Sequence, residues 1–113
     1  VNSLAQWAAV AAVQGDQSHL AAMRDEYLVR RDILVEALTG IEGVRPFVPR
    51  GTFFLWVELD PSIYRRLEVA DAAALSDQLA EAGIGSAPGE AFGNSCSDAI
   101  RFAFSCATPM VRE

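Results

Sequence analysis

Residues 52–59, with the sequence TFFLWVEL, constrain the fold more than any other segment of this chain. The run is rich in aromatic and β-branched side chains, which favour strands, and it contains hardly any polar residue. A strand that is apolar along its length must be covered on both faces. We therefore expect a central, well-buried strand here, entered through a turn at residues 49–51.

Three further segments are predicted to be extended. Residues 44–48 contain Pro46, and because proline cannot donate a ladder hydrogen bond, this strand is expected at an edge of the sheet. Residues 100–105 begin with the alternating sequence IRFAF, which places three apolar side chains on one face and Arg101 on the other. Residues 84–87 form a short extended segment.

Helices are predicted where apolar residues recur at helical spacing between capping and turn-forming residues. The predicted helices span approximately residues 3–14, 17–39 and 71–82. The polar connection at 60–68 is expected to contain at most one helical turn. These elements predict an α+β fold. A small antiparallel or mixed sheet carries helices packed on it and is preceded by the first two helices.

The first predicted helix is apolar almost all round, with the sequence LAQWAAVAAV at its centre. Such a helix needs neighbours on every face, and a domain of 113 residues offers few. The sequence begins with Val1, and we read residues 1–113 as one domain taken from a longer protein. The apolar run is too short to span a bilayer and lacks the basic start of a signal peptide, so a cytoplasmic protein without a membrane partner is expected.

Composition excludes several classes of function. All nine basic residues are arginine, so no residue of this chain supplies a lysine amine for Schiff-base chemistry or for a phosphate-binding P-loop. A net charge of −6 argues against a nucleic-acid partner. One histidine and two cysteines are too few for a structural zinc site, and we expect no metal. Cys96 and Cys106 are expected to be reduced thiols, with a disulfide as the alternative.

Arg101 is the most informative candidate for a site. A charged residue in the middle of a strand costs free energy unless it faces solvent or a partner. Its same-face neighbours, Ala103 and Ser105, are small and leave space around it. A guanidinium on a rigid strand is well suited to binding a carboxylate through two parallel hydrogen bonds. The alternative is an ordinary surface arginine without a special partner.

Two glycine-containing segments are candidate pocket walls. In the loop APGEAFG, which spans residues 87–93, Pro88, Gly89 and Phe92 place turn-forming residues around one aromatic ring. Gly51, Thr52 and Phe53, at the start of the central strand, could line the mouth of a pocket. For both segments the alternative is a tight connection with no ligand.

The order of these pieces resembles that of a known family. The motifs are, in order, Ser3 and Gln6 in an Ala-rich helix, Tyr27 and Arg30-Arg31-Asp32, Gly43-Val44, Pro49-x-Gly51-Thr52-Phe53-Phe54, Glu81-Ala82-Gly83-Ile84, Pro88-Gly89-x-x-Phe92-Gly93 and Ile100-Arg101-Phe102-Ala103. Together they resemble the C-terminal small domain of the fold-type-I, pyridoxal-phosphate-dependent aminotransferases of the aspartate aminotransferase class. The resemblance covers essentially the whole chain. Each motif alone is weak, and their order and spacing are what make it specific.

The resemblance implies an enzyme that transfers an amino group between an amino acid and a 2-oxo acid. In such enzymes a strand arginine of the small domain binds the α-carboxylate of the substrate, and Arg101 occupies that motif position. The lysine that holds the cofactor, and most other cofactor contacts, belong to the large domain. This chain is therefore expected to contain no catalytic and no cofactor-binding residue, to bind no pyridoxal phosphate and to be inactive alone. Its implied partners are the large domain of the same polypeptide, the substrate, and a second copy in a homodimer.

Two other functions remain open from the residues themselves. A free-standing regulatory module could use Arg101 to bind an organic acid without catalysis. A dimerisation domain without a small-molecule site could use the exposed apolar face of the first helix. The identity of the amino-acid substrate does not follow from these residues.

Overall fold

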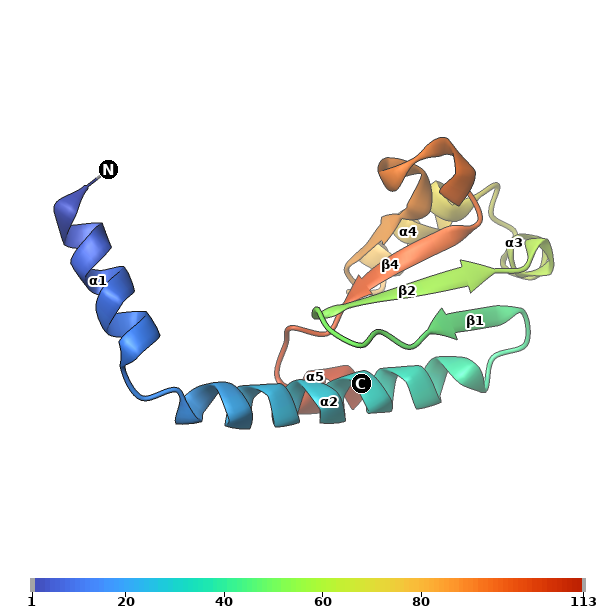
Figure 1. Ribbon diagram of the computed structural model, residues 1–113. Helices are drawn as coiled ribbons and strands as arrows, with labels where there is room; N and C mark the ends of the chain where they lie inside the picture. Colours follow the sequence, from blue (N-terminus) through green and yellow to red (C-terminus); the bar gives the residue numbers. More distant parts are fainter. Residues whose placement is uncertain (1, 113) are drawn as a thin grey trace.

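In the part of the chain that the structure describes, the sheet has four strands, all antiparallel, in the order β1-β2-β4-β3 (Figure 1). The computed structural model of the chain describes residues 2–112. Its strands are β1 (Val44–Phe47), β2 (Phe54–Leu59), β3 (Ser86–Pro88) and β4 (Ala99–Ala103). The predicted α+β class is confirmed, and of the two sheet types left open the antiparallel one is found.

The positions of the strands follow from their side chains. β2 lies inside the sheet, and its residues Leu55 and Val57 are fully buried. β1 contains Pro46 and lies at one edge, as predicted, and Pro88 lies in the strand at the other edge. β2 begins at Phe54 and not at residue 52, because Thr52 has a left-handed backbone with φ of 67° that a strand cannot include.

Five α-helices accompany the sheet within the described residues. They are α1 (Ser3–Gln14), α2 (Ser18–Thr39), α3 (Pro61–Leu67), α4 (Ala72–Glu81) and α5 (Thr108–Arg112), and two short 3₁₀ helices, η1 (Gly89–Phe92) and η2 (Asn94–Cys96), precede β4. The three long helices agree with prediction to within one residue at each end.

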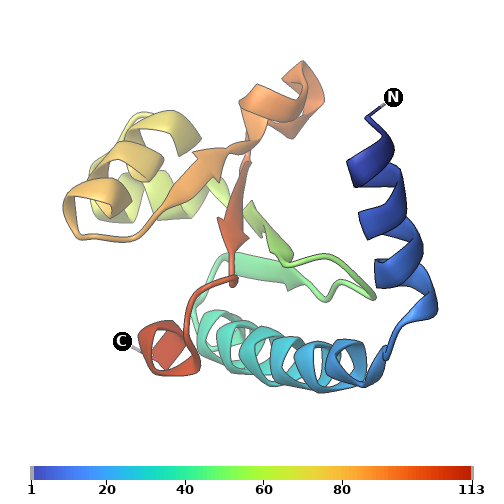
Figure 2. The same cartoon turned by 90° about the vertical axis from the view of Figure 1, so that its left-hand side faces the viewer.

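Two helices exceed what the sequence indicated. α3 is a full helix where one turn was expected, because Asp60 accepts a hydrogen bond from the backbone of Ser62 and Pro61 occupies the first helical position. α5 follows the last strand, where no further element was expected. It lies against α2 (Figure 2). The Nε of Arg30 donates to the hydroxyl of Thr108 over 3.2 Å.

The core lies on one face of the sheet. Buried side chains of β2 and β4 meet those of α3 and α4 and one residue beyond β4; the cluster comprises Leu55, Val57, Leu59, Ile63, Tyr64, Ala72, Leu75, Ile100 and Phe104. α2 adds partly buried side chains, among them Tyr27, Leu34 and Leu38. Cys96 and Cys106 are free thiols, as the sequence predicts. The opposite face of the sheet is left for the site described below.

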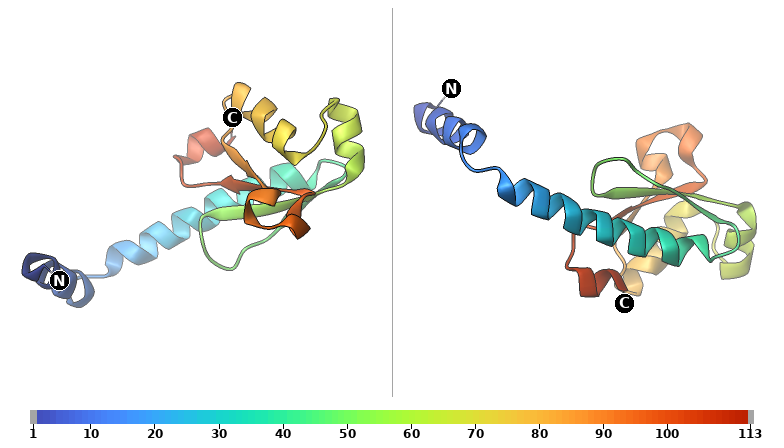
Figure 3. Two further views of the ribbon diagram at one scale, coloured as in Figure 1. Left: turned by 90° about the horizontal axis from the view of Figure 1, so that it is seen from above. Right: turned by 60° about the horizontal axis from the view of Figure 1, so that its bottom comes forward.

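α1 stands apart from this core (Figures 1 and 3). None of its residues is buried, and Trp7 is 74% exposed. The molecule is consequently extended, with a radius of gyration of 17.7 Å, against about 13 Å for a compact domain of this length. The predicted helix is confirmed, but residues 2–112 do not supply the neighbours that its apolar surface needs. In that part of the chain no helix has both the length and the apolarity needed to cross a membrane.

Gly89 occupies a position where a side chain does not fit. It is buried at the start of η1, and a Cβ atom built on it would lie 2.1 Å from the carbonyl oxygen of Cys96 and 2.9 Å from that of Ala99. Both neighbours are backbone atoms, which cannot rotate away as a side chain does. The absence of a side chain at Gly89 therefore allows the loop to pack against the chain itself.

We predict that Gly89→Ala lowers the free energy of unfolding by about 3 kcal/mol, at the upper end of the cost of overpacking. Gly85→Ala is the matched control, because a Cβ at Gly85 meets nothing within 4 Å. It should change stability by less than about 1 kcal/mol. Urea unfolding of both variants provides the measurement, and equal midpoints would contradict the packing argument.

Tyr64 carries a buried hydroxyl that has no hydrogen-bond partner among the described residues. Desolvation raises the pKa of this phenol to about 12, and the carboxylate charge of Asp98 adds to the shift. An unfolded tyrosine titrates near 10. Because the folded pKa is the higher one, stability is complete below pH 10 and is lost as the pH rises through 12.

We predict that Tyr64→Phe removes this part of the pH dependence. The free energy of unfolding should fall less steeply between pH 10 and 12 in the variant than in the parent. At neutral pH the variant should be as stable as the parent or more so, because an unpaired buried hydroxyl is removed. Urea midpoints measured at intervals from pH 7 to 12 test both points, and parallel curves would refute the first.

Candidate functional site

Arg101 lies in the middle of β4, on the face of the sheet opposite the core. Its neighbour in the chain, Ile100, is 1% exposed and points into the core, so Arg101 points the other way. Across the sheet it pairs with Trp56 on β2 and with Ala87 on β3. Strands on both sides therefore fix its backbone, and its side chain is half-buried.

Two aromatic rings approach the guanidinium. The Cζ atom lies 4.0 Å from the ring centroid of Phe54, on β2, and 4.3 Å from that of Phe92, in η1. Phe92 also contacts Trp56 edge-on, with ring centroids 5.8 Å apart. The positive charge thus rests against aromatic faces, an arrangement that their quadrupoles favour.

No acidic side chain of residues 2–112 neutralises Arg101. The ion pairs in this part of the chain are formed by Arg24, Arg30, Arg31 and Arg45. Cation–π contacts leave the N–H groups, which point outward in the guanidinium plane, free to donate. Arg101 therefore combines a fixed position with unused donors, which is the arrangement that an anionic ligand requires.

An open cavity of about 290 Å³ lies beside Arg101. The side chains around it are small apart from one ring; the lining residues are Phe54, Gly85, Ser86, Ala87, Arg101 and Ala103. This space is large enough for a group the size of a carboxylate to approach the edge of the guanidinium. The cavity offers one charged group and otherwise apolar or small walls.

The candidate pocket-lining residues fall into two places. Phe92 contacts Arg101, while Pro88 ends β3 and Gly89 is packed against the chain itself. The missing side chain of Gly89 makes room for the backbone of Cys96 and Ala99.

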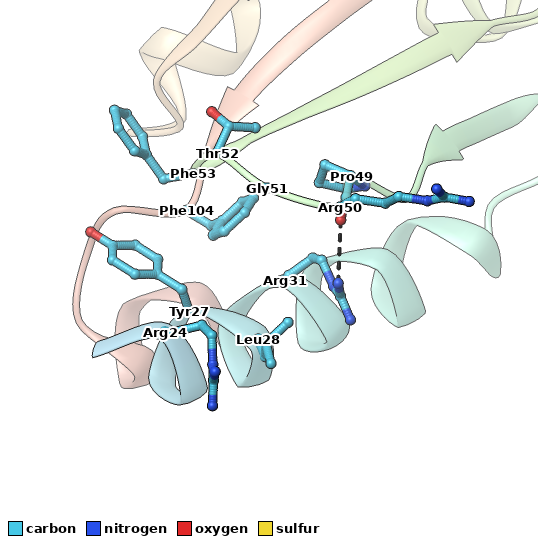
Figure 4. Close-up of a pocket in the computed structure, with 10 residues that line it drawn as sticks. All are labelled: Arg24, Tyr27, Leu28, Arg31, Pro49, Arg50, Gly51, Thr52, Phe53 and Phe104. Carbon is cyan, nitrogen blue, oxygen red and sulfur yellow. Dashed lines mark hydrogen bonds between the residues drawn. The ribbon is translucent and has the colours of Figure 1, made fainter. Parts of the chain in front are cut away.

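The second place is a separate cavity of about 270 Å³ between α2 and the loop that leads into β2 (Figure 4). Gly51, Thr52 and Phe53 line it, together with Arg24, Tyr27, Leu28, Arg31, Pro49, Arg50 and Phe104. In Figure 4 the side chains of Arg24 and Arg50 point away from this space. Arg31 donates to the backbone oxygen of Pro49 over 3.2 Å. The three arginines therefore do not converge on a common point here.

Neither Phe54 nor Trp56 is among the residues that were predicted to line a pocket, although the family resemblance places the segment from Gly51 to Phe54 near the substrate. Their alternation in TFFLWVEL places both on one face of the strand, and that signal was present. What the sequence lacked was the register of β2 against β4, which pairs Trp56 with Arg101 and brings Phe54 diagonally beside it.

Comparison with known proteins places the chain among aminotransferases. The sequence model of the family described as aminotransferase class I and II matches residues 1–113. The LL-diaminopimelate aminotransferase of Syntrophobacter fumaroxidans is 39% identical over 108 residues, which are 96% of this chain and 26% of that protein. The arginine–pyruvate transaminase AruH of Pseudomonas aeruginosa is 34% identical over 109 residues, with the same shares. The chain thus spans about a quarter of the length of these curated relatives.

Solved structures give the same result. The substrate-bound BacF structure from Bacillus subtilis superposes with a TM-score of 0.79 at 28% identity, over 95% of this chain and 26% of that one. An aspartate aminotransferase of Thermus thermophilus, a tetra mutant, superposes with a TM-score of 0.80 at 25% identity, over 98% of this chain and 29% of the other.

Proposed function

The chain belongs to the class I and II aminotransferases, and we propose that it forms the C-terminal small domain of such an enzyme, with Arg101 binding the α-carboxylate of the substrate. The reaction of the whole protein is the transfer of an amino group between an amino acid and a 2-oxo acid. The partners in this proposal are the large domain of the same polypeptide and a second copy in a homodimer, in the cytoplasm. Two findings support this proposal: the relatives are named as aminotransferases, and this chain spans about a quarter of their length.

One observation carries the role of Arg101: its guanidinium is held on a rigid strand, beside an open cavity, with no acidic partner among residues 2–112. A guanidinium presents parallel N–H groups that match the two oxygens of a carboxylate. Because the side chain is half-buried, the interaction is less screened than that of an exposed arginine. The geometry suits recognition of a group common to all amino acids.

The family uses pyridoxal phosphate, which when bound supplies an electron sink for the carbon that bears the amino group. The donor set of this chain does not fit that cofactor. The sequence contains no lysine to attach it, and the cavity at Arg101 offers one guanidinium and no second charged group for a phosphate. We therefore assign the cofactor and the proton transfers to the large domain and expect the isolated chain to be inactive.

What this chain contributes is orientation. A carboxylate held by Arg101 fixes the rotation of the substrate about its central carbon, so that the bond to be broken keeps one direction. The proposed small domain is a unit of sheet and helices joined to α1 through the short break at residues 15–17. Movement of this unit toward the large domain would bring Arg101 onto the substrate and exclude water.

We predict that Arg101→Ala in the full-length enzyme lowers kcat/KM by about 2–5 kcal/mol in free-energy terms, the range for removing one partner of a buried charge pair. Arg101→Lys should lose part of this, because an ammonium keeps the charge but not the paired donors. Steady-state kinetics with the amino acid as the varied substrate provides the measurement.

Arg45→Ala is the matched control. Arg45 lies on the same face of the sheet, on β1, but it is exposed and paired with Glu58, 3.7 Å away. Its variant should stay within about twofold of the parent. Unchanged kinetics of Arg101→Ala would refute the proposal. Tight binding of amino acids by an enzyme that shows no turnover would favour a regulatory module instead.

A further inference from the structure

Phe54 and Phe92 reach Arg101 from different parts of the chain. Phe54 lies on β2, two residues before the Trp56 that pairs with Arg101, and so is a diagonal neighbour on the same face. Phe92 comes from η1, which follows β3. Both ring centroids lie within 4.3 Å of the guanidinium carbon. In the described part of the chain the aromatic contacts do not include a Phe54–Phe92 pair. Each ring therefore contacts the guanidinium without pairing with the other.

Each ring has support of its own. Phe92 packs edge-on against Trp56, and the helical turn that carries it is pressed against the backbone of Cys96 and Ala99 at Gly89. Phe54 contacts Phe53, with ring centroids 4.3 Å apart. Neither ring can turn aside without losing these contacts. The guanidinium therefore rests against two rings that each have a packing contact of their own.

We propose that Phe54 and Phe92 are positioning residues, an aromatic clamp that holds the Arg101 guanidinium in one plane before the substrate arrives. This rests on the proposed role of Arg101 in binding the carboxylate. A free arginine side chain samples many rotamers, and ordering it on binding opposes affinity. The clamp removes that cost in advance. Because both rings lie within 4.3 Å of the guanidinium carbon, a carboxylate has to reach the N–H donors from the directions that the rings leave open.

The clamp acts through Arg101 and does not transfer protons. Loosening it should weaken substrate binding equally before and at the transition state, which raises KM and leaves kcat little changed. The effect should also depend on the presence of the guanidinium. These two features separate positioning from a general loss of folding, which would lower the active fraction and hence kcat.

The test uses the full-length, cofactor-loaded enzyme with Phe92→Leu, which keeps an apolar side chain but removes the ring. Phe92 is 48% exposed, so the substitution should be tolerated. We expect KM for the amino-acid substrate to rise roughly fivefold, with kcat within twofold, the order of one cation–π contact. Phe92→Tyr should restore KM to within twofold. Phe54→Leu gives a second, independent reading.

Phe47→Leu is the matched control, since Phe47 pairs with Trp56 on the same face of the sheet and is 68% exposed. It should leave KM unchanged. The double variant Arg101→Ala, Phe92→Leu should be no worse than Arg101→Ala alone. An unchanged KM in Phe92→Leu, or an equal loss in the Arg101→Ala background, would overturn the clamp. An unaffected Arg101→Ala enzyme would instead overturn the proposed function on which the clamp rests.

Discussion

The register between β2 and β4 is the constraint on which the rest of this structure depends. It pairs Trp56 with Arg101, and Val57 with Ile100. Val57 and Ile100 thus point into the core, whereas Trp56 and Arg101, which precede or follow them in the chain, face away from it. If the register slipped by one position, the guanidinium of Arg101 would point into the core, among leucine, valine and phenylalanine side chains, where it would have no partner. The same hydrophobic pattern that stabilises the domain therefore fixes the direction of its one mid-strand charge.

The apolar helix α1, unlike the sheet, has no buried residue in this structure. The sheet, α2, α3 and α4 bury their own apolar faces against one another, but within residues 2–112 no residue of α1 is buried. Within the proposed enzyme, α1 would pack on the large domain, and the sheet would carry Arg101 toward it. The two halves would then contribute different chemistry. The large domain would hold the cofactor, while this chain, which has no lysine, would hold the carboxylate.

Features that depend on local sequence could be predicted well. Proline assigned β1 to an edge, the apolar run at 52–59 gave the inner strand, and alternation gave the face of Arg101. α3 was underestimated because the capping role of Asp60 before Pro61 was not weighed.

Features that depend on contacts between distant residues could not be predicted. The approach of Phe92 to Arg101 requires η1 to fold over the sheet, and no spacing in the sequence encodes that distance. For the same reason the sequence could not show that the segment at Gly51 lines a cavity of its own, whereas Phe92 of the loop at residues 88–93 contacts Arg101. The sequence also does not distinguish a glycine such as Gly89, whose missing side chain makes room for backbone, from a glycine that makes room for a ligand.

A crystal structure of the full-length enzyme with a non-reacting amino-acid analogue would test the central claim most directly. We predict that both oxygens of the analogue's α-carboxylate lie about 3 Å from guanidinium nitrogens of Arg101. The carboxylate and guanidinium planes should coincide. A carboxylate bound elsewhere, with Arg101 paired to an acidic side chain of the protein, would contradict it.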